Sequence, residues 1–157
     1  MEKKTIIKYG VELTVIDDEV IEGDFIHPEE RFYFSKSIHI KGRLEVKAYF
    51  AVESILIDKS EEVGEWQTVG GSQTVGWSQT VGESQEVGGW QTVGWSQTVG
   101  GSQTVGGSQT VGGSQEVKDG IVVGLSITVQ GTMTVGKRIF AGVCNWKDIS
   151  DRAGADF

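Results

Sequence analysis

Residues that cross-link a fold or bind a metal are scarce in this chain of 157 residues, which has 1 Cys, 2 His and 1 Pro. The lone cysteine, Cys144, excludes an internal disulfide framework and a zinc site built from several cysteines. The histidines, His27 and His39, are too few for any site that needs three. No apolar run reaches the roughly 18 residues that a transmembrane helix requires, so we expect no membrane span.

Basic residues are also in the minority, with 14 Lys and Arg against 22 Asp and Glu, a net charge of -8. A negative chain is not expected to bind nucleic acid directly through its overall field. The first residues lack the apolar core and cleavage site of a signal peptide. These features predict a cytoplasmic protein that does not associate with membranes.

Glycine is abundant, at 23 residues, and much of it is periodic. From Val63 to Val117 a unit close to Val-Gly-Gly-Ser-Gln-Thr recurs every six residues. A helix has a period of 3.6 and could not keep one apolar stripe with this spacing. Each glycine would also cost a helix about 1 kcal/mol. The unit therefore predicts a short Gln-Thr-Val strand followed by a glycine corner.

The same spacing continues on both sides of this tract and defines the domain boundaries. Apolar residues two apart, which share one face of a strand, recur from Phe32 to Ala141 with a one-residue slip before Ile55. We predict an N-terminal acidic cap over residues 1–31, a repeat domain over 32–141 and a C-terminal cap over 142–157.

A second period, three times as long as the first, predicts how the strands coil. The third place of successive units reads Glu65, Gly71, Trp77, Glu83, Gly89, Trp95, so that Glu, Gly and Trp each recur at every third unit. Three units per turn would stack like on like. The prediction is an all-β fold, a triangular parallel β-helix with about 18 residues per coil and about 6 turns, each rising ~4.8 Å.

The Val-Gly step resembles the hexapeptide-repeat family over residues 32 to 141. Members of that family form left-handed parallel β-helices, so the resemblance implies a left-handed coil, whereas ordinary parallel crossovers are right-handed. The glutamine departs from the family, in which a small residue is usual. Residues 120–146 also resemble the endings of uncharacterised bacterial and phage repeat proteins.

The glutamine is predicted to face inward, because Ile121, Ile127 and Met133 continue its place with apolar residues. Each amide would then donate to the turn above and accept from the turn below, giving three ladders of three. The alternative places Ser and Thr inside and Gln and Val outside.

Two groups of residues are candidate binding sites. The first lies between Gly10 and Glu30, where eight acidic residues occur without Lys or Arg, and it includes Asp17, Asp18, Glu19, Glu22 and Asp24. This segment is either a surface for a basic protein, such as one that binds nucleic acid, or a solvated cap that blocks edge pairing. It lacks the ligand spacing of a calcium loop, so neither a metal nor a cofactor is expected.

The second group is a set of tryptophans on an otherwise Gly/Ser surface, namely Trp66, Trp77, Trp90 and Trp95. Trp77 and Trp95 are expected one turn apart at the same corner. Exposed aromatic residues are enriched at interfaces. The alternative interpretation is that corner tryptophans cover and protect a flat polar coil.

No enzyme is expected. The resemblance implies acyltransferases as the usual enzymes on this fold, with a catalytic histidine near a loop that leaves the coil. Here no loop interrupts the repeats after Ile55, and His39 is predicted to face outward without a partner.

The leading hypothesis is a non-enzymatic protein-interaction module, such as a phage or mobile-element inhibitor of a host nucleic-acid enzyme. One alternative is a scaffolding solenoid that forms a homodimer or assembles end to end through its open strand edges. A second alternative is an ice-binding protein, because outward Ser-x-Thr arrays would line its faces.

Overall fold

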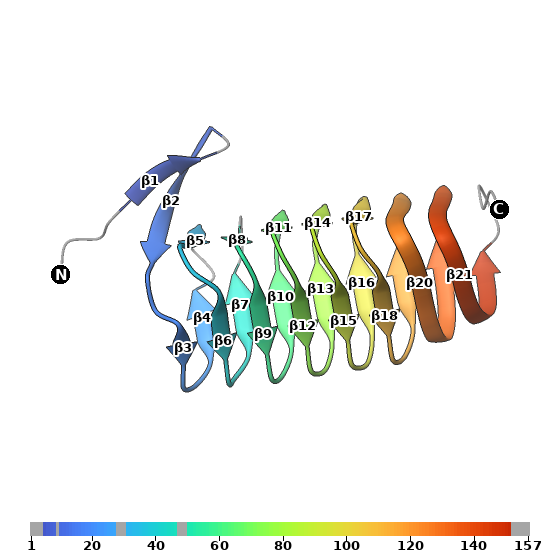
Figure 1. Cartoon of the computed structure of the whole chain (residues 1–157), viewed down its shortest axis with the longest axis horizontal. Helices are drawn as coiled ribbons and strands as arrows, with labels where there is room; N and C mark the ends of the chain where they lie inside the picture. The colour runs from blue at the N-terminus through green and yellow to red at the C-terminus, as the bar shows by residue number, and fades with distance from the viewer. Residues whose placement is uncertain (1–4, 9, 28–30, 47–49, 152–157) are drawn as a thin grey trace.

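The computed structural model describes residues 5–8, 10–27, 31–46 and 50–151, with the backbone alone for Lys8, Val11, Phe50 and 143–151. It is all-β and forms a parallel solenoid of about 7 turns with about 18 residues per turn (Figure 1). The predicted fold class and coil length are confirmed, and the protein has one turn more than expected. The left hand of the coil stays a prediction from the resemblance.

Three walls of stacked short strands, most of them three residues long, surround the solenoid axis (Figure 1). Wall A contains β4 (Phe25–His27), β7 (Leu44–Val46), β10 (Glu61–Val63), β13 (Gln79–Val81), β16 (Gln97–Val99) and β19 (Gln115–Val117). Wall B contains β2 (Val11–Ile16), β5 (Phe32–Phe34), β8 (Phe50–Val52), β11 (Gln67–Val69), β14 (Gln85–Val87) and β17 (Gln103–Val105). Wall C contains β3 (Val20–Ile21), β6 (Ile38–Ile40), β9 (Ile55–Ile57), β12 (Gln73–Val75), β15 (Gln91–Val93) and β18 (Gln109–Val111).

The last turns are built by two long strands that bend around the corners. They are β20 (Gly120–Val135) and β21 (Arg138–Asp151). Strand β20 pairs in register with β17, β18 and β19, and so extends all three walls. Residues 142–151, expected as a cap, belong to β21, which continues the parallel pairing with β20. The side chains of Cys144 and Trp146 lie outside the described residues.

The first turn lies within residues 1–31. Strands β2, β3 and β4 pair in parallel with β5, β6 and β7. This acidic segment therefore adds the first strand to each of the three walls. Its turn has an irregular length, because Thr14 pairs with Phe32 at the regular spacing but Val20 pairs with His39, one position farther along the chain. This change in spacing conceals the turn in the sequence. The slip predicted before Ile55 is visible in its pairing with Ile38, which shortens that turn by one position.

A β-hairpin precedes the first turn. Strand β1 (Thr5–Lys8) pairs antiparallel with β2, and Gly10 between them has a φ of 77°, which favours glycine. A small second core forms on the outside of wall B, where Leu13 and Ala51 are buried and Ile6 and Tyr33 pack against them. The hairpin therefore covers the outer face of wall B at the N-terminal end.

The Val-Gly step is required by the close stacking of corners. A Cβ added at Gly100 would lie 1.9 Å from the carbonyl oxygen of Gly82, and one at Gly82 would lie 1.9 Å from that of Gly64. Real side chains do not approach backbone atoms this closely, so a larger residue at these places requires the turns to adjust, as they do where Lys118 stacks on Gly100. The glycine in each successive unit thus follows from the turn-to-turn spacing.

The interior has different contents along its length. At the N-terminal end it holds aromatic and large aliphatic side chains, and Phe25 packs edge-on against Phe32 with ring centroids 4.9 Å apart. At the C-terminal end it holds Ile, Val and Met residues. Between them, nine buried glutamines alternate with buried valines: Gln67, Gln73, Gln79, Gln85, Gln91, Gln97, Gln103, Gln109 and Gln115. The inward orientation of the glutamines is confirmed.

The glutamines do not form three separate ladders as predicted, but a single network. Each amide from Gln79 onward donates two hydrogen bonds toward the N-terminus, one to the same wall of the preceding turn and one to a neighbouring wall. Gln91, for example, donates to Gln73 at 3.0 Å and to Gln79 at 2.9 Å. The second bond crosses between walls, because glutamine side chains from all three walls extend to the solenoid axis and meet there. The ladders are therefore cross-linked.

The network begins at a buried carboxyl group, which replaces the amide in β10. Glu61 is 2% exposed and accepts hydrogen bonds from Gln67, from Gln73 at 2.6 Å and from Gln79 at 2.7 Å. Because both oxygens of Glu61 accept, the amides above it all point their N–H groups toward it. Burial raises the pKa of Glu61 to about 8, whereas the hydrogen bonds from Gln79 and Gln67 act to lower it.

The network ends where the next turn becomes apolar. The Oε1 atoms of Gln109 and Gln115 are buried and accept no hydrogen bond within the described part of the chain. Ile121, Ile127 and Met133 follow in the places from which further amides would donate. The two ends of the network are therefore chemically different.

Candidate interaction surfaces

The four candidate tryptophans lie at three different corners. Trp66 lies between walls A and B, Trp90 between walls B and C, and Trp77 and Trp95 between walls C and A. The backbone N–H of Trp95 donates to the carbonyl of Trp77 at 2.9 Å, which confirms that these two residues stack on consecutive turns. All four side chains are exposed.

Trp77 and Trp95 form what we call the tryptophan ridge. Their side chains are 62% and 63% exposed, so they do not fold down over the coil. Above them the corner continues with Gly112 and Gly113, and each tryptophan is followed by a serine. Two adjacent indoles thus stand on a rigid edge, with Lys59 one turn before them and glycines one turn after them.

The acidic segment is tied to the second turn. Lys36 Nζ lies 2.9 Å from Glu19 Oε1, and Lys41 Nζ lies 2.9 Å from Glu22. The hydrogen bond from Lys36 holds the pKa of Glu19 below its ordinary value. These pairs join stacked corners, so the two acids mainly face bases of the same chain.

Two further acids of this segment have partners in the second turn as well. Ser35 Oγ donates to Asp17, and the backbone N–H of Arg43 donates to Asp24 Oδ1 at 2.7 Å. Asp18 is exposed. The structure thus brings four of the five candidate acids into contacts between turns, and these contacts leave less acidic surface for a partner than the sequence suggested.

Wall B carries a second exposed surface that the sequence analysis missed. A shallow depression of about 510 Å³ lies beside Trp66 and is lined by Ser84, Glu86 and Thr104. A second one of about 360 Å³ continues from Thr104 to Phe140. Aligning the hexads by wall would have revealed this surface, because its outward residues recur at every third hexad.

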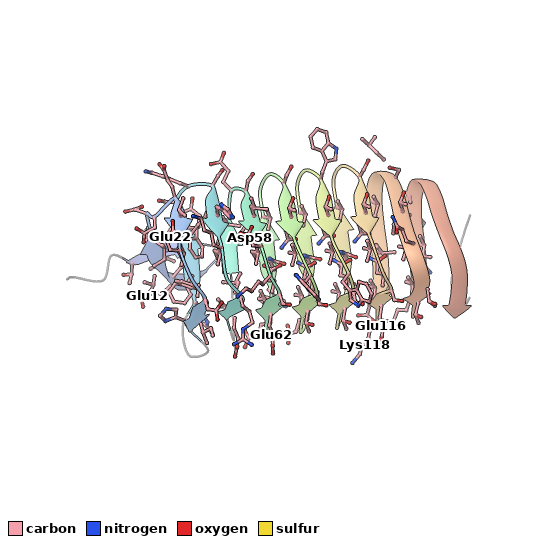
Figure 2. All side chains as sticks on the ribbon, turned by 90° about the horizontal axis from the view of Figure 1, so that it is seen from below. Glu12, Glu22, Asp58, Glu62, Glu116 and Lys118 are labelled. Atoms are coloured by element: carbon pink, nitrogen blue, oxygen red, sulfur yellow. The ribbon has the colours of Figure 1, made fainter. Side chains whose placement is uncertain are left out.

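Charge is segregated along this surface. Four exposed glutamates take part in none of the ion pairs among the described residues: Glu65, Glu83 and Glu86 on this surface, and Glu62 on the adjoining wall A. Lys118, Lys137 and Arg138 occupy the same corner farther along, together with Asp119, which pairs with Lys137. Figure 2 shows Glu62 and Lys118 on the same long edge, with Glu62 nearer the N-terminal end.

Candidate catalytic and metal-binding groups remain few. His39 is not unpartnered as expected, because its Nε2 lies 2.8 Å from Asp58 Oδ1. In the residues that the structure describes, no group of three or more His, Cys, Asp or Glu could hold a metal ion. The described part of the chain also has no helix long and apolar enough to cross a membrane.

Comparison with known proteins found no matching family model, no similar curated protein and no similar solved structure. The β-solenoid is therefore established by the strand pairings, and membership of the hexapeptide-repeat family stays a prediction.

Proposed function

We propose that the protein is a non-enzymatic interaction module whose tryptophan ridge binds a protein partner. The observation that carries this proposal is the exposure of Trp77 and Trp95 on consecutive turns. Indole rings bury large apolar areas when a partner covers them, and tryptophan is among the residues that contribute most at interfaces. The solenoid holds the two rings on stacked backbone, so little conformational entropy is lost on binding.

The net charge of -8 favours a partner with a basic surface. A nucleic-acid-binding protein has such a surface, and inhibition of a host nucleic-acid enzyme by a phage or mobile-element protein is the form of this function that we put forward. The contacts of the acidic segment with the second turn make it a weaker candidate than the tryptophan ridge.

The test uses substitutions that restore the commonest repeat unit. Trp77→Gly and Trp95→Gly convert two units to Val-Gly-Gly-Ser-Gln-Thr, so the fold should persist. Leu56→Thr is the matched control, because Leu56 is exposed on wall C where Thr74 follows it in register. We expect the amount of partner protein captured from host lysate to be at least tenfold lower with the ridge variant than with the wild type. The control variant should capture as much as the wild type. Equal capture by both variants would refute the proposed binding role of the tryptophan ridge.

End-to-end scaffolding is a second candidate. Within the described residues, β3 and β4 each pair on one side only, and β21 pairs only with β20. Unpaired edges can accept strands of another copy. Negative-stain microscopy would show filaments if this is the function, and compact particles if it is not.

Ice binding has one specific observation in its favour. Wall C carries four outward threonines stacked in register, Thr74, Thr92, Thr110 and Thr128. Such a column gives hydroxyl groups a regular spacing of ~4.8 Å. A thermal-hysteresis measurement on the wild type decides this candidate, and an absence of hysteresis removes it.

A further inference from the structure

Exposed apolar side chains gather on wall B and its two corners from Trp66 onward. Besides Trp66 and Trp90, they are Val122, Leu125 and Phe140. Val122 and Phe140 are paired neighbours in register, 45% and 48% exposed. Nearer the N-terminus, the outer face of the same wall is already covered by the hairpin through Leu13. The uncovered part continues the same face, with apolar side chains at its corners and at Val122 and Phe140.

Five successive rows make up this section, each consisting of a corner and its wall B strand. They are residues 64–69, 82–87, 100–105, 118–123 and 136–141. The central row contains Ser102 and Thr104, which line both depressions. The first two rows have acidic corners, with Glu65 and Glu83, the fourth holds Lys118 beside Asp119, and the last is basic, with Lys137 and Arg138.

The first and last rows of this face are complementary to each other. A two-fold axis parallel to the central strand, β17, would place a second copy face to face with the first and reverse the direction of its solenoid axis. The order of the rows is then reversed, but each position within a row faces the same position within the row of the second copy. The first row would then face the last row of the second copy, and the second row would face the fourth. We propose that wall B is the interface of an antiparallel homodimer of this chain.

The outermost pair of rows matches in charge. Glu65 lies opposite Lys137 of the second copy, and Trp66 lies opposite its Arg138, an arrangement suited to a cation–π contact. In the next pair of rows, Glu83 lies opposite Asp119. The charge of Asp119 is already offset by Lys137 of its own chain at 2.7 Å, which limits the repulsion between the two acids.

The far corner of the wall matches in apolar character. Trp90 lies at the corner that follows the second row, and Leu125 lies at the corner that follows the fourth. The same two-fold axis places these two exposed side chains on facing corners, one place apart along the row, because Trp90 is the third residue of its corner and Leu125 is the second.

The outward strand positions complete the face. Phe140 lies opposite Thr68, whose methyl group can contact the ring. Val122 lies opposite Glu86, so at this place an apolar side chain faces a charged one. The apolar contacts thus concentrate at the two corners, around Trp66 and Trp90.

The area limits the affinity. Five rows at ~4.8 Å and a side of six residues give a flat face of roughly 400 Å² per copy. The total lies below the range of stable interfaces, so we expect a dissociation constant on the order of 10 μM. Salt should weaken the dimer, because its charge pairs lie at an exposed rim.

The proposal is independent of the tryptophan ridge. The ridge occupies the vertex opposite wall B, so the dimer would leave both copies of it free, pointing away from the interface. Self-association is measured on the purified protein, whereas the ridge is tested by capture of a partner. Either proposal can fail while the other holds.

The first experiment is sedimentation equilibrium from 1 to 200 μM. The wild type should shift from the 17.0 kDa of one chain toward twice that mass. Trp66→Ser with Trp90→Ser, which restores the usual serine of the repeat, should weaken association at least tenfold. The ridge variant Trp77→Gly with Trp95→Gly removes two tryptophans that are at least as exposed, from the opposite vertex, and should have no effect.

The second experiment reverses charges. Glu65→Lys and Lys137→Glu should each weaken the dimer at least tenfold, and the two together should restore part of the lost affinity, because Lys137→Glu also removes the charge that offsets Asp119. A monomer at every concentration would overturn the proposal. Growth into larger polymers, or association that the wall B variants leave unchanged, would overturn it too.

Discussion

The glutamine-filled middle of the solenoid and its apolar-filled flanks have the same backbone but are stabilised in different ways. In residues 61–117 each wall contributes a buried polar side chain to every turn, whereas in residues 32–57 and 121–139 the same place holds Phe, Ile, Leu or Met. Apolar side chains pack without regard to direction. The amides form a network with a beginning at Glu61 and an end at Gln115. One backbone repeat therefore accepts two kinds of interior.

The hydrogen-bonding needs of the buried amides explain why residues 61–117 are so uniform in sequence. A buried amide is costly unless its donors and acceptor are satisfied. An interior glutamine such as Gln91 donates twice and accepts twice, and all four partners are glutamines of the neighbouring turns. Replacing one member disturbs four others, whereas an apolar flank tolerates swaps of similar volume.

The largest expected effect comes from breaking the network in its middle. Gln91→Leu removes four hydrogen bonds, each worth about 1 kcal/mol, so we expect a loss of about 4 kcal/mol in the free energy of unfolding. Gln115→Leu is the matched control, because Gln115 donates twice and accepts none. Its cost should be half or less. Urea denaturation measures both, and equal costs would show that the network does not act as described.

A smaller effect is expected at the corners. Gly100→Ala forces a Cβ against the carbonyl of Gly82, and such overpacking typically costs roughly 1–3 kcal/mol. Gly120→Ala is the control in the C-terminal flank, because its Cβ would come no closer than 3.5 Å to its nearest neighbour. Thermal denaturation should show a lower melting temperature for Gly100→Ala and a melting temperature near that of the wild type for Gly120→Ala. The reverse order would contradict the corner geometry.

The pH dependence of stability tests the beginning of the network. Burial raises the pKa of Glu61 from 4.5 to about 8, so between these values the folded state holds a proton that the unfolded state has lost. Stability should therefore fall as pH rises through this window, by up to about 1.4 kcal/mol per pH unit. Glu61→Gln should flatten the profile and be the more stable protein at pH 9. Parallel profiles for the two proteins would contradict this assignment.

The smallest effect is expected from removing one complete turn. Deleting residues 79–96 takes out three whole hexads, so the walls and the amide network close again in register. We expect a folded, shorter solenoid whose melting temperature changes by only a few degrees, because repeat stability is roughly a sum of nearest-neighbour terms. Circular dichroism measures this. Deleting residues 38–54 from the apolar flank should be more harmful, since its side chains differ from turn to turn.

Much of the fold was predictable because the repeat is local in its rules. The strand length, the glycine corner and the inward glutamine all follow from a single hexad, and the recurrence of Trp77 as Trp95 gives the turn. The first turn was hidden because Val20 and Phe25 pair one position beyond the regular spacing, where no period repeats. A pattern can reveal only those turns that share it.

The candidate surfaces were less predictable. The tryptophans were identified as residues, but their distribution over three corners requires the wall assignment of every strand. The ties between Glu19 and Lys36 and between Glu22 and Lys41 fall on either side of the regular spacing, in a turn that the sequence did not reveal.

The sequence by itself determined the period, the strands and what faces inward, because these depend on steric and polar rules that act within one repeat. Only the tertiary structure decided how amides from three walls join at the axis, that Glu61 begins their network, and that Trp66 and Arg138 share one face. Those relations arise between residues in different walls or several turns apart. They depend on how the coil closes, a geometric property of the whole turn rather than of any one hexad.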